Sequence, residues 1–532
     1  MTMVKKNDQL HHDDEHDEEV EKDEGKKVKT SFWMLLGVIL LALIPRFYFL
    51  FFKADIQTFS SLWYGDVWHH WMIGYLTKEI GLSKGFLRLW DLKGMEYYWG
   101  ALHPLLLAAL FKIFGTADVL IPRLLSLVCG VTSISLVFLI VRRYWGLAVA
   151  WGAVIFASLS PIGIFNDASG LTDPLSVMLI LWAVYFWPRK AFWAGVMLAL
   201  AAMNRAEYWL FALGMVLVSM VIYRDWDKRI TMFAGWFGVM ILYMKYLVNW
   251  TGNAIYPVAI NFMATAKGGW FAGVNFDRKA LTNIAICKGI FIGAGLGTIL
   301  VWWKKIKGRW LWFFGLMNLG FLGYMLGFSE YRQSWMAADR VWVDRLWNWP
   351  QMFLGIVMAV VVLGWLPKRF KWWKKLHLGW LTMGAVVVTS QLLWKVYVDN
   401  GGLASFRWNY IRPLAKVTIG AYEGGSILLP EITDFLAYAL YRYEGIEGKY
   451  FIGQMFGPFY YIEGDVYENW EENRERVADF FRENDIRLMV INDKQERKRD
   501  DYLRLIRKEP DWFTFVTEYH EKMIYKVHLP EI

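Results

Sequence analysis

The chain has 532 residues, of which 56% are hydrophobic and 18% aromatic, including 32 Trp. A soluble protein of this length does not need so much apolar surface for its core, so part of that surface must face lipid. The formal net charge of +9 does not indicate a nucleic-acid partner, because Lys and Arg form short clusters between apolar runs and not one basic face.

The first element is a polar tail followed by an apolar run. Residues 1–30 are mostly charged and end in a lysine cluster, and the run at 31–52 follows directly. This run is too long for the apolar part of a cleaved signal peptide, and no small-residue cleavage site follows it. We therefore predict a disordered cytoplasmic tail at 1–30 and a signal anchor.

Eleven apolar runs approach the length of about 17–25 residues that a spanning helix needs. They are 31–52, 119–141, 144–164, 171–187, 191–204, 207–223, 230–248, 286–303, 310–328, 348–366 and 378–398. If the N-terminus is cytoplasmic, every inner connection is basic, as the positive-inside rule requires, and the C-terminus lies outside. The sequence predicts an all-α multi-pass domain at 31–398 in the cell membrane.

Two outer segments are long enough to carry function. In the outer loop 53–118, the apolar stretch 103–115 is too short to span and suits a helix lying in the membrane surface. From residue 399 the chain becomes charged and periodic, with strand patterns at 486–491, 513–519 and 523–527. We predict a small α/β extracytoplasmic domain at 399–532.

Asp66 lies just beyond the first span and begins a helix-like stretch. A carboxylate there can take a proton from an acceptor hydroxyl, and the aromatic residues around it limit water and raise its basicity. Aspartate is also a favoured helix N-cap, and the two roles are compatible.

A second acidic cluster joins the third and fourth spans and contains Asp167 and Asp173. Acidic residues opposite a lipid phosphate can hold a divalent cation or orient a sugar hydroxyl. Alternatively, Thr172 caps the fourth span and Asp173 lies in its first turn. We favour the capping role for Asp173, and both roles stay open for Asp167.

Arginines at membrane depth cost about 2–3 kcal/mol or more unless they are paired or solvated. Arg46, Arg123 and Arg205 are predicted to lie at such depths, with Glu207 available to Arg205, and Arg340 lies on an outer loop. The fork of guanidinium donors can bind a phosphate leaving group, whereas snorkelling to the interface is the alternative.

The outer loop 53–118 also contains His69, His70 and His103. With Asp66 they can form a metal site, although adjacent histidines on a helix point to different faces, so at most one of the first two joins Asp66. The sequence leaves a divalent cation open. It has no Walker loop and no dinucleotide fingerprint, so a nucleotide-driven reaction lacks support.

Across residues 31–210 the order of these motifs resembles the GT-C superfamily of membrane glycosyltransferases, particularly relatives of protein O-mannosyltransferases and of the lipid A aminoarabinose transferase. The resemblance rests on Asp66 and on the segments 99–105, 111–115, 122–126, 165–167 and 204–207. The family often has an Asp-Glu pair at its first acidic site, whereas Val67 follows Asp66 here. Residues 65–70 also look like the first acidic loop of oligosaccharyltransferases, whose WWDYG motif is missing from this tail.

The resemblance implies a GT-C fold of about eleven transmembrane helices. It also implies an inverting glycosyltransferase that moves a sugar from a polyprenyl-phosphate donor of the dolichyl type to a protein, lipid or glycan acceptor on the non-cytoplasmic face. The implied catalytic residues are Asp66 as general base and Asp167 as an orienting group. The implied substrate-binding residues are Arg205, Arg340, His103 and His70.

Three other functions stay open. They are en bloc glycan transfer of the oligosaccharyltransferase kind, movement of a lipid-linked glycan by a flippase or other transporter, and a non-enzymatic assembly role. A transporter is expected to place polar residues along several helix interiors, whereas the acids here concentrate in outer loops.

Overall fold

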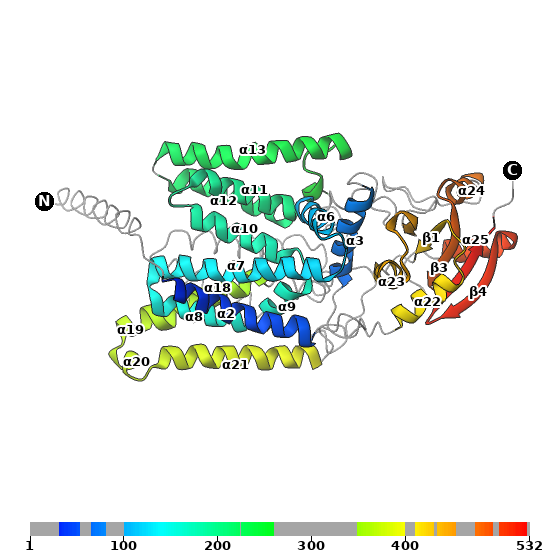
Figure 1. Cartoon of the computed structure of the whole chain (residues 1–532). Helices are drawn as coiled ribbons and strands as arrows, with labels where there is room; N and C mark the ends of the chain where they lie inside the picture. Colours follow the sequence, from blue (N-terminus) through cyan, green and yellow to red (C-terminus); the bar gives the residue numbers. More distant parts are fainter. Residues whose placement is uncertain are drawn as a thin grey trace.

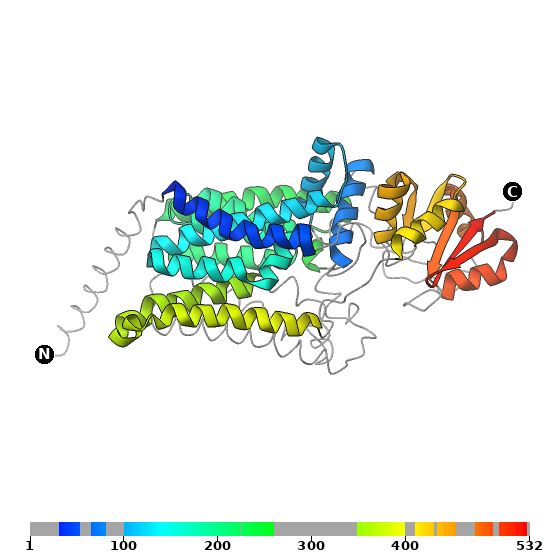
Figure 2. The ribbon, with the colours of Figure 1, turned by 60° about the horizontal axis from the view of Figure 1, so that its bottom comes forward.

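The computed structural model describes residues 31–53, 65–80, 100–223, 225–259, 348–399, 410–429, 434–453, 474–492 and 500–528. They form a bundle of roughly parallel helices, a pair of helices at one end of it, and a mixed sheet beyond that pair (Figure 1). A second view keeps this order, so α3 and α6 lie between the bundle and the sheet (Figure 2).

The bundle helices are apolar and mostly short. They are α2 Phe32–Tyr48, α7 Leu120–Trp145, α8 Leu147–Leu159, α9 Pro161–Ser169, α10 Asp173–Phe186, α11 Ala191–Asn204, α12 Glu207–Ile222, α13 Trp226–Thr251, α18 Asn348–Ala359, α19 Leu366–Arg369, α20 Lys371–Lys375 and α21 Leu378–Asp399. Two π-helical segments, η1 Phe49–Lys53 and η3 Val360–Trp365, extend α2 and join α18 to α19. Among the described residues, four helices are long and apolar enough to span a membrane, or five if the bent pair α8–α9 is one span.

The predicted apolar runs agree with these helices where they can be compared. Nine of the eleven runs fall on described residues, and each is helical. The runs 286–303 and 310–328 lie outside the described residues. The chain is an integral membrane protein, and the total of eleven spans stays a prediction.

The third predicted run differs from the structure because the helix breaks inside it. α8 ends at Leu159 and α9 starts at Pro161, with an angle of 62° between them. Proline has no backbone N–H, so Pro161 cannot continue the hydrogen-bond ladder of α8. The break turns α9 across the end of the bundle and extends the run beyond residue 164 to Ser169.

Glycines let α11 and α13 touch along their backbones. A Cβ atom on Gly195 would lie 2.1 Å from the carbonyl oxygen of Met232, and one on Gly235 would lie 2.2 Å from that of Phe192. The hydrophobic effect does not drive helices together in lipid. Small residues instead allow the close van der Waals contact that stabilises such crossings.

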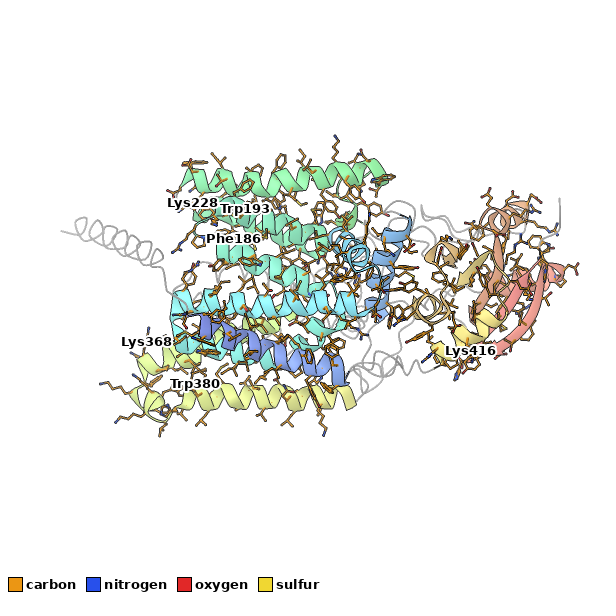
Figure 3. All side chains as sticks on the ribbon, viewed as in Figure 1. Phe186, Trp193, Lys228, Lys368, Trp380 and Lys416 are labelled. Carbon is orange, nitrogen blue, oxygen red and sulfur yellow. The ribbon has the colours of Figure 1, made fainter. Side chains whose placement is uncertain are left out.

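The basic connections gather at the end of the bundle away from the sheet. Figure 3 places Lys228, in the first turn of α13, and Lys368, in α19, at this end, together with the junction of α10 and α11 marked by Phe186 and Trp193. The opposite ends of the helices face α3 and α6 (Figure 1). The bundle therefore has one basic end and one end next to the sheet.

The sheet has five strands in the order β2-β1-β3-β5-β4. They are β1 Ser426–Leu429, β2 Phe451–Gly453, β3 Ile486–Asn492, β4 Phe513–Tyr519 and β5 Lys522–Val527. β1 is parallel to β2 and β3, whereas β5 is antiparallel to β3 and β4. The three strand patterns noted in the sequence coincide with β3, β4 and β5 to within a residue at each end.

Helices cover both faces of this sheet. They are α22 Ile411–Gly420, α23 Asp434–Glu444, α24 Arg474–Glu483 and α25 Asp500–Lys508. Alternate residues of β3 point to opposite faces. Leu488 and Val490 join a core that includes α22 and α23, whereas Met489 and Ile491 join a second core with α24 and α25.

The first of these cores continues into α3 Gly65–Ile80 and α6 Leu102–Phe114. The ring of Trp71 lies 4.8 Å from that of Tyr438, measured between centroids. The Tyr441 hydroxyl accepts a hydrogen bond from the backbone N–H of Ala117 at 3.1 Å. The Tyr75 hydroxyl accepts one from the N–H of Gly448 at 2.9 Å, and burial raises the Tyr75 pKa, which keeps the phenol neutral. The sheet is thus bonded to the pair of helices that it faces.

Replacing Tyr75 by Phe tests this junction. The change leaves the buried N–H of Gly448 without its acceptor, which costs about 1–3 kcal/mol. We expect a lower unfolding temperature in detergent and faster protease cleavage between bundle and sheet. Tyr519→Phe is the control, since its hydroxyl makes no hydrogen bond within the part of the chain that the structure describes. Equal behaviour of the two variants would contradict the assigned role of the Tyr75 hydroxyl.

Candidate active site

Buried polar side chains concentrate where the bundle meets α3 and α6. Each is at most 2% exposed, and together they come from seven helices, the turn before α10 and the break between α11 and α12. They are Arg46, His70, His103, Arg123, Ser126, Asn166, Asp167, Ser169, Thr172, Asp173, Asn204 and Arg205. Burial of so many polar groups is costly unless they bond to one another or to a ligand.

Asp66 lies in the first turn of α3, which begins at Gly65. The start of α3 packs on the turn after α9. Cγ1 of Val67 lies 3.4 Å from the position that a Cβ on Gly170 would take. The N–H of Gly170 donates to Oγ of Ser126 at 3.0 Å, which ties that turn to α7. The backbone of Asp66 therefore adjoins the acidic cluster that follows the third span, while its side chain lies outside the described residues.

This placement alters the predicted capping role of Asp66. Since α3 already includes Gly65, Asp66 follows the helix start and does not precede it. Asp66 is therefore not the N-cap residue of α3, which would precede the helix.

Asp167 forms a buried ion pair with Arg46 of α2. Nε and Nη2 of Arg46 each lie 2.8 Å from Oδ2 of Asp167, and the two side chains are 0% and 1% exposed. Asp167 is the seventh residue of α9, and its side chain packs on Gly130 of α7, where a Cβ would lie 2.2 Å from Cγ of Asp167. One of the two acids predicted for catalysis thus accepts hydrogen bonds from an arginine.

Arg205 forms the second buried ion pair, with Asp173 at the start of α10. Its Nη1 lies 3.0 and 2.9 Å from the two carboxylate oxygens and donates to Oγ1 of Thr172 at 3.3 Å. Thr172 is the N-cap residue of α10 and Asp173 lies in its first turn, as predicted, but the Thr172 hydroxyl contacts Arg205 and makes no cap hydrogen bond. The side chain of Glu207, the partner expected from the sequence, lies outside the described residues.

His103 and His70 form a buried pair beside this ion pair. Their rings are 5.6 Å apart between centroids and nearly perpendicular, at 71°. Neither ring nitrogen of His103 has a hydrogen-bond partner within the described ranges. Burial and the nearby charge of Arg205 lower the His103 pKa to about 3, so its imidazole is neutral at pH 7. It can therefore contact a ligand by hydrogen bonding but not as a cation.

The contact of α6 with the break after α11 holds His103 in place. Gly100 precedes α6 with φ of 118°, and a Cβ there would lie 2.4 Å from the carbonyl oxygen of Asn204 and 2.5 Å from that of Met203. The side chain of Asn204 donates to the Thr172 carbonyl at 2.9 Å and to Oγ of Ser176 at 2.7 Å. The same helix break thus orients both His103 and Arg205.

Replacing Gly100 by Ala is expected to separate α6 from this break. The new methyl group meets two backbone oxygens, and the positive φ adds strain, for a cost of about 3 kcal/mol. The unfolding temperature in detergent measures this. Gly214→Ala is the matched control, since that helical glycine has no atom within 4 Å of its Cβ position and the change is neutral or stabilising by up to about 1 kcal/mol. Similar stability of the two variants would argue against the α6 contact.

The described residues do not supply a ligand set for the divalent cation that the sequence left open. Within them there is no group of three or more His, Cys, Asp or Glu side chains placed to hold a metal. The carboxylates of Asp167 and Asp173 both accept hydrogen bonds from arginines. The side chains of Asp66 and His69, and all of Arg340, lie outside the described residues.

Sequence comparison finds neither a matching family model nor a matching curated protein. Solved structures do match. The oligosaccharyltransferase of Archaeoglobus fulgidus, crystallised with Zn and sulfate, aligns with a TM-score of 0.50 and 12% identity over 92% of this chain and 72% of its own. The same enzyme tethered to an acceptor peptide containing the NVT sequon aligns with a TM-score of 0.50 and 11% identity over 94% and 74%.

ArnT from Cupriavidus metallidurans bound to undecaprenyl phosphate aligns with a TM-score of 0.48 and 12% identity over 93% of this chain and 98% of its own. At such identities only the fold is shared. The chain therefore has the fold of the GT-C membrane glycosyltransferases, as the order of its sequence motifs indicated.

Proposed function

We propose that this protein is a membrane glycosyltransferase that moves a sugar from a polyprenyl-phosphate donor to a protein, lipid or glycan acceptor, with inversion at the anomeric carbon. The observation that carries the proposal is the position of Asp66. The first turn of α3 packs against Gly170, at the end of the bundle where the buried arginines and histidines gather. The GT-C fold supports this assignment.

The proposed active site faces the non-cytoplasmic side. Lys228 and Lys368 lie at the opposite end of the bundle, and basic connections favour the cytoplasm. In this orientation the tail 1–30 is cytoplasmic, 31–398 forms the membrane domain of about eleven helices, and the loop 53–118 contributes to the site. The domain 399–532 is then extracytoplasmic and bonded to α3 through Tyr75.

The proposed reaction is a single displacement. Asp66 removes the proton of the acceptor hydroxyl as its oxygen attacks the anomeric carbon. The bond between that carbon and the phosphate oxygen breaks, and its electron pair leaves with the lipid phosphate. Arg205, oriented by Asp173, and Arg340 stabilise the phosphate charge, because guanidinium matches phosphate geometry. His103, as a neutral imidazole, and His70 hydrogen-bond the headgroup.

En bloc transfer of an oligosaccharide is the second candidate function. The match to an oligosaccharyltransferase solved with an acceptor peptide favours it. The absence of a WWDYG motif after residue 399 favours single-sugar transfer. The mass added to the acceptor distinguishes the two, since one sugar residue and a complete glycan differ several-fold in mass.

Mass analysis of lipid-linked sugars and glycans in a deletion strain tests the proposed function. Loss of one transferase should remove a sugar from a glycan, protein or lipid and leave its polyprenyl-phosphate donor unused. An unchanged set of glycoconjugates would contradict the proposal. For a flippase, liposomes would instead show movement of the sugar-lipid across the bilayer without sugar transfer.

A further inference from the structure

Arg46 uses all five of its N–H groups within the protein. Guanidinium has five donors. Nε and Nη2 reach Oδ2 of Asp167, and Nη1 donates to the carbonyls of Ala42 at 3.0 Å and Ser158 at 3.1 Å. The remaining Nη2 donor reaches the carbonyl of Ala157 at 3.3 Å. Arg46 therefore joins α2, the end of α8 and α9, and directs no further N–H group toward a ligand.

The carbonyl groups that Arg46 contacts lie at the break between α8 and α9. In a continuous helix the Ala157 carbonyl would accept a hydrogen bond from the N–H of residue 161. Pro161 has none, so the side chain of Arg46 supplies the missing donor. The bend of 62° thus depends on the guanidinium of Arg46 in α2, and the carboxylate of Asp167 balances its charge.

Asp167 in turn fixes α9 against α7. Its side chain occupies the space that a Cβ on Gly130 would need. Gly170 follows three residues later, and its N–H donates to Oγ of Ser126. A Cβ on Gly170 would lie 3.4 Å from Cγ1 of Val67, so the two residues are in contact. A continuous line of contacts therefore runs from Arg46 through Asp167 and the end of α9 to the residue next to Asp66.

We propose that Asp167 is a positioning residue and neither a general base nor a metal ligand. With Arg46 it holds the α8–α9 bend and thereby places the Gly170 turn against the first turn of α3. A divalent cation on the same carboxylate oxygen would lie beside the guanidinium, and the two positive charges would repel. The effect on transfer rests on the proposed function, whereas the coupling between Arg46 and Asp167 does not.

A double-mutant cycle tests the coupling. Asp167→Leu and Arg46→Met each remove one partner of the buried ion pair, so each should lower the unfolding temperature in detergent by about 5 °C or more. The double variant R46M/D167L removes both charges, and it should recover at least half of the summed loss. Additive losses in the double variant would overturn the pairing.

Kinetics of the double variant test the positioning role. We expect kcat per folded enzyme to fall about tenfold while the donor KM and the pH dependence stay those of wild type, because only the placement of Asp66 is relaxed. Any change in unfolding temperature that Mn²⁺ produces in wild type should persist in R46M/D167L.

Three results would overturn the positioning role: activity as low as that of Asp66→Asn, loss of an Mn²⁺ shift seen in wild type, or an unchanged kcat. If wild type itself transfers no sugar, the proposed function fails, and the temperature cycle still decides whether Arg46 and Asp167 form a structural pair.

Discussion

Asp66→Asn is expected to lower sugar transfer about a thousandfold and to leave a folded, membrane-inserted protein. A general base contributes roughly 10²–10⁴ to a rate, and an amide cannot take the proton of the acceptor hydroxyl. Asparagine has nearly the shape of aspartate, so the packing of α3 against Gly170 should persist. Loss of the charge in the first turn costs only about 0.3–1 kcal/mol. Transfer by purified enzyme in liposomes measures the effect.

A second variant and a stability measurement make the Asp66 result specific. Asp66→Glu retains a carboxylate one methylene further out and should keep a small part of the activity. The unfolding temperature of Asp66→Asn in detergent should stay within a few degrees of wild type, which separates lost chemistry from lost folding. A fully active Asp66→Asn would remove Asp66 from the mechanism.

Asp173→Asn is expected to lower the free energy of unfolding by about 3–5 kcal/mol, because it leaves Arg205 as a buried charge without its carboxylate. Both side chains are only 2% exposed, so water cannot replace the lost partner. Transfer should fall as well, since Arg205 loses the contact that orients it. Denaturant unfolding in detergent measures the change in the free energy of unfolding.

The exposed pair of Lys228 and Asp225 is the matched control. Their charged groups are 3.0 Å apart, but the side chains are 37% and 60% exposed. Asp225→Asn should therefore change stability by less than about 1 kcal/mol. If Asp173→Asn cost no more than Asp225→Asn, the Arg205 pair could not be the buried anchor of the α11–α12 break.

Apolar length and charge distribution predicted most of the helices, because lipid exposure dictates both. They did not predict the break at Pro161. An apolar run reads the same whether its helix is straight or bent, and proline only signals a local loss of hydrogen bonding. The direction of the bend depends on Arg46, which lies more than a hundred positions earlier in the chain, as the separation of 121 residues between Arg46 and Asp167 shows.

The residue types of the site could be anticipated, but their pairing could not. Sequence proximity indicates Glu207 as a partner of Arg205, and the side chain of Glu207 lies outside the described residues, but proximity does not indicate the bond to Asp173, 32 positions away. Local spacing identifies neighbours on one helix, and contacts between helices depend on how the bundle packs. Membrane depth is a usable signal for these pairs: each arginine at membrane depth needs an acid at similar depth, and Asp167 and Asp173 are such acids.

Sugar transfer by the purified wild-type protein in liposomes tests the central claim most directly. A set of radiolabelled polyprenyl-phosphate sugars is supplied with acceptor extracts, and labelled product is analysed by mass and anomeric configuration. Transfer of one sugar with inverted configuration, absent in Asp66→Asn, is the predicted result. Movement of the labelled lipid between leaflets without any labelled acceptor would contradict it.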